Sequence, residues 1–219
     1  MEVQMKKNVS DVKNTSDSHE YNIYCVPETG FYINVVKRIF DIVFSVVCLI
    51  ILSPVMLVTA ICIKLTDGGR IIYYQDRLTL NGKVFRCYKF RSMSEDAEKD
   101  GIARLSVYND PRVTPVGKIL RRFHIDEFPQ LINVIKGEMS VVGPRPERPE
   151  LAAQIEETLP QFRQRLSVKA GITGYAQVMG RYTTLPSEKL RMDMLYIEDI
   201  SLSLDIRIII LTVVQLFKK

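Results

Sequence analysis

Residues 42–63 read IVFSVVCLIILSPVMLVTAICI, a run of 22 residues without a charged side chain. At about 1.5 Å per residue, a helix of this length is long enough to cross the ~30 Å hydrocarbon core of a bilayer. The simplest interpretation of the run is therefore a transmembrane helix, and the rest of the chain has to be placed relative to it.

The centre of the run favours a second interpretation. Ser53 and Pro54 stand in its middle. An interior proline removes one backbone hydrogen bond and bends a helix, and the serine hydroxyl can bond the carbonyl that is left over. Each half of about 11 residues would reach about 16 Å, half of the core. Residues 36–66 would then form a re-entrant helix-break-helix that enters and leaves the membrane on one face.

Basic residues flank the run on both sides, with Lys37 and Arg38 before it and Lys64 and Arg70 after it. An excess of basic residues marks the cytoplasmic side of a membrane segment. Two basic ends give no direction across the membrane, which agrees with a re-entrant path. On the residues alone, the spanning and the re-entrant interpretations both stay open.

Length and composition divide the chain into three parts. With 219 residues, 47% of them hydrophobic, it suits one domain of moderate size with appendages. We expect residues 1–35 to be a disordered or irregular leader, and no signal peptide, because the apolar run begins too late. We expect residues 67–219 to form a cytosolic α/β domain, mostly helical with a small β-hairpin. The apolar run at residues 206–217 is either a core helix or one that lies in the membrane interface.

The charge balance limits the partners of the chain. The formal net charge of +5 and the pI near 9.0 are compatible with nucleic acid, an anionic membrane surface or a phosphorylated substrate. No familiar nucleic-acid motif is present, so we expect no nucleic acid as a partner. The four cysteines have neither zinc-ligand spacing nor the pattern of a disulfide framework, which indicates a reducing environment.

Two short strands are predicted at residues 71–74 and 84–90, around a turn at Asn81-Gly82. Alternation places Lys89 and Arg91 on one face of the second strand, and two cations on one face suit a diphosphate. The alternative is a solvated basic edge that discourages strand pairing.

An adjacent carboxylate pair, Asp126-Glu127, precedes an apolar-periodic helical run that ends at Gly137. Asp126 is either an ordinary helix N-cap or a carboxylate with a chemical role. Arg121 and Arg122 come just before the pair, and their charges would keep Asp126 ionised.

Two further segments suit phosphate binding. The run Gly143-Pro144-Arg145-Pro146 predicts a rigid turn that holds Arg145 outward, because each proline fixes its own φ and restrains the residue before it. Glycines mark residues 171–180, where the backbone can approach a ligand closely, and Arg181 follows them.

Three ordered motifs resemble those of the bacterial sugar transferases, the monotopic polyprenol-phosphate phosphoglycosyl transferases. They are Lys-Phe-Arg-Ser-Met at residues 89–93, the stretch 120–146 around Asp126-Glu127, and Gly-Ile-Thr-Gly-Tyr-Ala-Gln-Val at residues 171–178. The similarity runs from about residue 36 to the C-terminus. The family's re-entrant segment carries a Ser-Pro at the place of Ser53-Pro54.

The resemblance implies a role for each candidate residue. Asp126 and Glu127 would be catalytic, with Glu127 also binding Mg²⁺. Substrate binding would fall to Lys89, Arg91, Arg145, Arg181 and, by family analogy, Asp193 in a predicted amphipathic helix at residues 187–198.

The implied reaction moves a phosphosugar from a nucleotide diphosphate sugar, a UDP-sugar, to polyprenyl (undecaprenyl) phosphate, releasing UMP through a covalent aspartyl intermediate. It would occur at the cytosolic face of the bacterial inner membrane and start the assembly of an exopolysaccharide, capsule, O-antigen or glycoprotein glycan that downstream glycosyltransferases extend. A carboxylate nucleophile fits, because an acyl-phosphate divides one displacement into two easier ones. The competing hypothesis is a non-catalytic membrane scaffold that binds nucleotide sugar or lipid phosphate.

Overall fold

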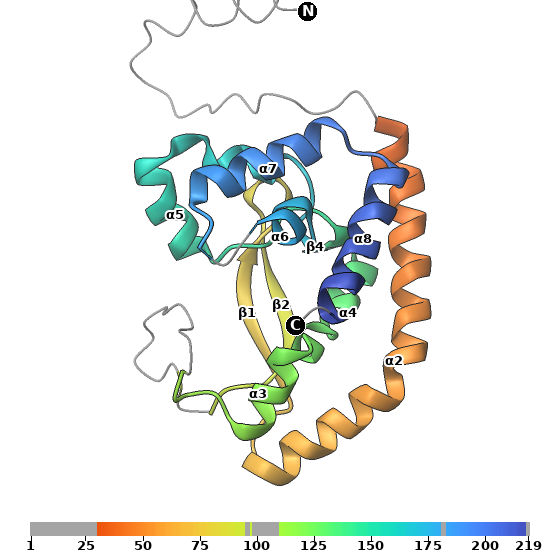
Figure 1. Ribbon diagram of the computed structural model, residues 1–219, viewed down its shortest axis with the longest axis vertical. Helices are drawn as coiled ribbons and strands as arrows, with labels where there is room; N and C mark the ends of the chain where they lie inside the picture. Colours follow the sequence, from red (N-terminus) through yellow and green to blue (C-terminus); the bar gives the residue numbers. More distant parts are fainter. Residues whose placement is uncertain (1–29, 95–96, 98–109, 181–182, 218–219) are drawn as a thin grey trace, which may run out of the picture.

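The computed structural model describes residues 30–94, 97, 110–180 and 183–217 (Figure 1). Most of the predicted leader therefore lies outside the described residues. In chain order, the helices and strands are η1 (Tyr32–Val36), α2 (Lys37–Asp67), β1 (Ile72–Leu78), η2 (Leu80–Gly82), β2 (Val84–Phe90), α3 (Pro115–Arg122), η3 (Ile125–Glu127), α4 (Gln130–Lys136), β3 (Ser140–Val142), α5 (Pro149–Thr158), η4 (Pro160–Ser167), β4 (Gly171–Thr173), α6 (Tyr175–Met179), α7 (Pro186–Glu198) and α8 (Leu202–Phe217). The prediction of a mostly helical fold with a small β-hairpin is confirmed.

Helix α2 is one helix with Pro54 inside it, and Figure 1 shows that it bends between its two halves. The expected break is therefore a bend and not an interruption. The Ser53 hydroxyl donates to the Ile50 carbonyl at 2.8 Å, the carbonyl that Pro54, lacking an N–H, cannot bond. This local substitution lets the helix continue through the proline.

The length and composition of α2 suit a membrane. Among the described residues, it is the one helix long and apolar enough to cross a bilayer, and only 11% of its most apolar 18-residue window is buried in the protein. Large apolar side chains such as Ile50, Ile51 and Leu57 are more than 60% exposed. Exposed apolar area of this extent marks a surface that is covered by something other than water.

The first turns of α2 form hydrogen bonds with the rest of the protein. Arg38 donates to the carbonyls of Val134 and Ile135 at 2.6 and 2.7 Å, so its guanidinium satisfies the C-terminal end of α4. Asp41 accepts hydrogen bonds from the Val141 N–H at 3.0 Å and the Ser140 hydroxyl at 3.1 Å. The basic start of the apolar run thus has a structural role.

A second anchor lies on α8, where the Asp205 side chain is fully buried. Its carboxylate pairs with Lys37 at 2.6 Å and accepts hydrogen bonds from the hydroxyls of Tyr32 at 3.1 Å and Tyr196 at 2.8 Å. A buried charge is tolerated only when it is paired and hydrogen-bonded. These contacts tie the start of α2 to the C-terminal helices.

The predicted hairpin forms, with its turn at Asn81 (φ 58°) and Gly82 (φ 72°). Strand β1 extends to Leu78, beyond the predicted end at Tyr74, because its pairing with β2 overrides a run of polar residues that breaks the apolar alternation. The outer edge of β2 is covered by the Asn133 amide, which accepts from the Tyr88 N–H at 3.0 Å and donates to the Arg86 carbonyl at 2.7 Å.

The core lies between the hairpin, α4, the short parallel pair of strands β3 and β4, and helices α6 to α8, and it includes Val134, Met139, Val142, Tyr196 and Ile197. Helix α8, at 16 residues, buries Ile208 in this core. Its opposite side exposes apolar residues including Ile206, Ile210 and Val213. One face of α8 is therefore a core face, and the other face is apolar and exposed. That the exposed face lies in a membrane interface stays a prediction.

Candidate active site

The carboxylate pair lies in η3, a single 3₁₀ turn that follows His124 in a left-handed conformation (φ 55°). Helix α4 begins only at Gln130, and its N-cap is Pro129 without a side-chain hydrogen bond. The interpretation of Asp126 as an ordinary N-cap is therefore wrong, since the chain completes a separate turn before the helix starts.

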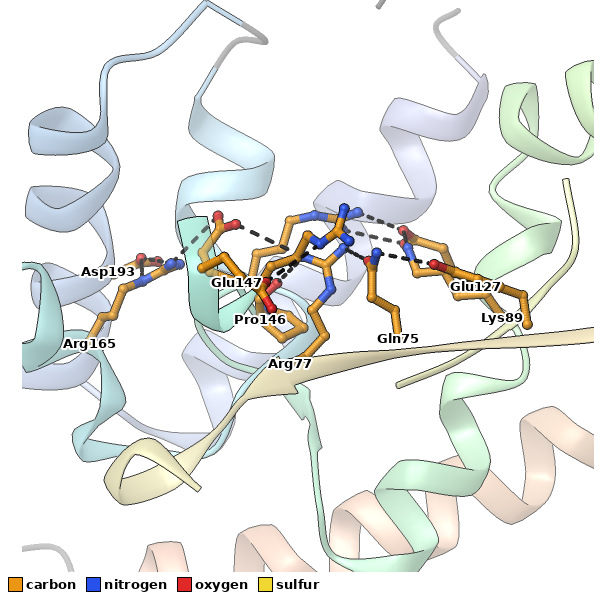
Figure 2. A network of polar contacts seen from close by, with 12 residues as sticks. Gln75, Arg77, Lys89, Glu127, Pro146, Glu147, Arg165 and Asp193 are labelled. Carbon is orange, nitrogen blue, oxygen red and sulfur yellow. Dashed lines mark hydrogen bonds and ion pairs between the residues drawn. The ribbon is translucent and has the colours of Figure 1, made fainter. Parts of the chain in front are cut away.

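Glu127 is the meeting point of two cations from distant segments (Figure 2). Its Oε1 atom lies 2.9 Å from Lys89 Nζ and 2.6 Å from Arg145 Nη2. Burial alone would raise the pKa of Glu127, but the charges of Arg145 and Lys89 outweigh it and hold this pKa well below its usual value. Glu127 is accordingly ionised at neutral pH.

Asp126 is in a different electrostatic state. Its side chain is buried, and burial raises its pKa, with a further contribution from the negative charge of Glu127. The charges of Lys89 and Arg121 oppose this rise without cancelling it. Arg121 thus favours the ionised form of Asp126, as expected, but desolvation has the larger effect on its pKa. Two adjacent carboxyls with pKa values shifted in opposite directions are suited to different roles.

Arg145 stands on the turn predicted from its flanking prolines, and its side chain is 44% exposed. The turn is pinned beside β4, where the Gly171 N–H donates to the Pro144 carbonyl at 2.9 Å. A Cβ atom on Gly171 would lie 2.1 Å from the Gly143 nitrogen. These glycines therefore allow two backbone segments to touch, a role in packing that differs from the predicted approach to a ligand.

The other predicted residues lie in several places. Arg91 follows the end of β2, and its side chain is buried. Asp193, in α7, is 1% exposed and accepts from Arg165 at 2.8 and 2.7 Å, so it lies in a buried ion pair. Figure 2 shows this pair at the far end of the network from Glu127. Arg181 lies outside the described residues.

Four residues of this network were missed by the sequence reasoning. They are Gln75, Arg77, Glu147 and Arg165, and they connect the hairpin to Asp193 (Figure 2). Gln75 and Arg77 could have been found by continuing the first strand, because alternation places them on the face that carries Lys89. No local signal marks Arg165, which depends on the packing of η4 against α7.

A small cavity opens beside the Glu127 cluster and is lined by Arg77, Cys87, Lys89, Gln130, Arg145 and Pro146. Its charged lining is cationic. Burial raises the pKa of the Cys87 thiol, which leaves this side chain protonated and unreactive. The cavity therefore suits an anionic group such as a phosphate.

The side chains of this site could hold a magnesium ion only if oxygen atoms of the substrate complete its coordination. The described residues contain no cluster of three or more histidine, cysteine, aspartate or glutamate side chains. Magnesium, however, commonly uses one or two carboxylates together with substrate phosphate oxygens. On Glu127, Oε1 carries both close cation contacts, whereas Oε2 has only a 3.5 Å contact from Arg145. Oε2 of Glu127 therefore fits a site that substrate phosphate oxygens would complete.

Comparison with known proteins gives a consistent set of relatives. An N-acetylgalactosaminephosphotransferase of Aeromonas hydrophila that acts with UDP-N-acetylgalactosamine and undecaprenyl phosphate is 40% identical over 181 residues, 81% of this chain and 43% of that protein. The UDP-glucose:undecaprenyl-phosphate glucose-1-phosphate transferase of Escherichia coli (strain K12) is 40% identical over 200 residues, 89% of this chain and 43% of that protein. The exopolysaccharide production protein PSS of Rhizobium leguminosarum bv. phaseoli is 42% identical over 190 residues, 83% of this chain and 94% of that protein.

The chain thus spans less than half the length of the first two relatives and nearly all of the third. The family model described as bacterial sugar transferase matches residues 32–219, from the π-helical turn before α2 to the C-terminus. The match covers every motif that surrounds the Glu127 cluster. Because this family model covers most of the chain and the relatives are about 40% identical to it, the chain belongs to the bacterial sugar transferase family.

Proposed function

We propose that this chain transfers a sugar 1-phosphate from a UDP-sugar to undecaprenyl phosphate, the first step in assembling a polysaccharide. The observation that carries the proposal is the unequal carboxylate pair: Glu127 is held as an anion between two cations, and Asp126 beside it is buried and not engaged in a cap. The names of the relatives support the substrate classes.

In the first step, a carboxylate oxygen of Asp126 attacks the phosphorus that bears the sugar. The bond between this phosphorus and the oxygen that bridges to the uridine phosphate breaks, and UMP leaves with the bond's electron pair. The product is an acyl-phosphate linking the phosphosugar to Asp126. Only the deprotonated carboxylate of Asp126 can attack. Its raised pKa means that the ionised form is a stronger base, and so a stronger nucleophile, than an ordinary aspartate.

In the second step, a phosphate oxygen of undecaprenyl phosphate attacks the same phosphorus. The bond to Asp126 breaks, the carboxylate is restored, and a diphosphate-linked lipid sugar is released. Lys89 and Arg145 would stabilise the charge that develops on the transferred phosphoryl group. Glu127 would hold a magnesium ion, whose positive charge would favour departure of UMP.

The bend in α2 supports a site at the level of the lipid headgroups. The proposed location is the cytosolic face of the inner membrane, where the water-soluble donor and the lipid phosphate can both reach Asp126. Downstream glycosyltransferases would then extend the lipid-linked sugar.

The proposal is tested with purified protein, a panel of UDP-sugars, undecaprenyl phosphate and Mg²⁺. We expect UMP release with at least one donor, continuing only while lipid acceptor remains. With donor alone, UMP release should stop at about one equivalent per active protein, as a covalent intermediate requires. Donor binding without UMP release from any UDP-sugar would contradict the proposal and favour a non-catalytic scaffold.

The re-entrant path is tested by labelling cysteines introduced at residues 34 and 67, in a variant whose Cys25, Cys48 and Cys62 are replaced by serine. Because both ends of α2 are expected on one side, a membrane-impermeant thiol reagent should reach both cysteines from the cytosolic side of inverted vesicles and neither from outside intact cells. Access to the two positions from opposite sides would show that α2 spans the membrane.

A further inference from the structure

Arg77 lies on the same face of the hairpin as Lys89 and lines the cavity beside Glu127. Its guanidinium makes two hydrogen bonds with different groups: Nη1 donates to the Pro146 carbonyl at 3.0 Å, and Nη2 donates to Gln75 Oε1 at 2.5 Å. The planar fork of an arginine can make both bonds in one fixed orientation. Arg77 is therefore attached to the residue that directly follows Arg145.

The turn that carries Arg145 is held on both of its sides. Before Arg145, the Pro144 carbonyl accepts from the Gly171 N–H at 2.9 Å, and after it, the Pro146 carbonyl accepts from Arg77. The Leu78 N–H, next to Arg77, donates to the Glu147 carbonyl at 2.9 Å. Arg145 lies between these hydrogen bonds, and its side chain donates to the Glu127 carboxylate.

The buried ion pair of Arg165 and Asp193 supports the same turn through Glu147. The Glu147 carboxylate lies 3.7 Å from Arg165 and 4.0 Å from Arg77. Arg165, 4% exposed, is itself fixed by Asp193 (Figure 2). Charges thus alternate from Asp193 to Arg77, which places Arg165 between two anions and Glu147 beside the Arg77 guanidinium.

We infer that Arg77 is a positioning residue, which holds the Pro146 carbonyl and thereby aims Arg145 at Glu127 and at the phosphate of the donor. The inference rests on the proposed function for the identity of the ligand. Fixing the turn before the ligand arrives reduces the conformational entropy that is lost on binding. Asp193, in this arrangement, acts at a distance through Arg165 and Glu147.

A double-mutant cycle between Arg77 and Arg145 tests the inference. We expect Arg77→Met and Arg77→Lys each to lower kcat/KM for the UDP-sugar about 10- to 100-fold, the effect of losing a hydrogen bond from a charged group. Lysine should rescue little, because it keeps the charge but lacks the two separate nitrogens that bond Pro146 and Gln75 in one fixed orientation. In an Arg145→Ala background, Arg77→Met should reduce kcat/KM by less than about threefold further, because the residue that it positions is gone.

The matched control is Arg86→Met, which removes an exposed arginine from the opposite face of the same hairpin. It should leave kcat/KM unchanged within about twofold. Full activity of Arg77→Lys, or effects of Arg77→Met and Arg145→Ala that multiply, would overturn the inference, because Arg77 would then act by charge alone or contact the ligand independently.

Hydrogen–deuterium exchange separates this inference from the proposed function, because it requires no turnover. In Arg77→Met and Arg77→Lys, exchange should increase in the peptide that covers residues 143–148 and stay unchanged in α7 and α8. Unchanged exchange at residues 143–148, or faster exchange throughout the protein, would overturn the positioning role even if UMP release proves the enzyme active. If the wild-type protein turns over no UDP-sugar, the proposed function fails, and the exchange result still decides whether Arg77 fixes the turn.

Discussion

Replacing Asp126 with asparagine should reduce UMP release by about 10⁴- to 10⁶-fold, the range seen when a covalent nucleophile is removed. Asparagine has nearly the same size and shape as aspartate, so the η3 turn and the neighbouring Glu127 cluster should persist. What is lost is the carboxylate oxygen that attacks phosphorus. The donor should still bind, because Lys89 and Arg145 keep their places on Glu127.

Mass spectrometry checks this result directly. Wild-type protein quenched after mixing with UDP-sugar alone should carry one added phosphosugar on the peptide that contains Asp126, and Asp126→Asn should carry none. Donor binding by the variant, measured by calorimetry, should stay within a few-fold of wild type. An unmodified wild-type peptide, together with kinetics that require both substrates bound at once, would defeat the covalent mechanism and leave Asp126 as a general base or metal ligand.

The matched control is Glu127→Gln, which changes the adjacent carboxyl in the same way. It should also lose activity, but through weaker Mg²⁺ binding and the release of Lys89 and Arg145 from their shared anion. Raised Mg²⁺ should therefore restore part of its activity and none of that of Asp126→Asn. The different responses to Mg²⁺ distinguish the nucleophile from the metal ligand.

Replacing Asp205 with alanine should lower the free energy of unfolding by about 3–5 kcal/mol, the cost of breaking a buried ion pair by removing one partner. The change would leave the buried Lys37 ammonium without its counter-charge and the hydroxyls of Tyr32 and Tyr196 without their acceptor. Because these groups join α2 to α8, the effect should appear as a cooperative loss of the whole domain. Chemical denaturation in detergent, followed by circular dichroism, measures it.

The control removes both charges together. Lys37→Met with Asp205→Leu removes both members of the buried pair and leaves Asp41 with its hydrogen bonds from Ser140 and Val141, so the double variant should be more stable than Asp205→Ala. A change below about 1 kcal/mol in Asp205→Ala would mean that water or another cation reaches this position and that the anchor contributes little to stability.

Much of the fold was predictable because its signals are local. Ser53 and Pro54 determine the bend in α2 through a hydroxyl and a missing N–H on adjacent residues, which both concern the Ile50 carbonyl one turn earlier. The turn at Asn81-Gly82 and the end of α4 at Gly137 depend on residues that tolerate positive φ. The Thr114 hydroxyl accepts from the Gly117 N–H at 2.9 Å and caps α3, another contact between residues close in sequence.

The sequence by itself also determined the adjacency of Asp126 and Glu127 and the motifs that identify the family. It did not determine which carboxyl is held as an anion. That depends on Lys89 and Arg145, which lie 38 and 18 residues away along the chain and meet Glu127 only in the folded protein. Local patterns describe contacts within a few residues, whereas the pKa of a carboxyl depends on burial and on every charge within several ångströms. For the same reason, only the tertiary structure decided that Arg77 supports the Arg145 turn and that Asp193 is paired with Arg165 in the interior.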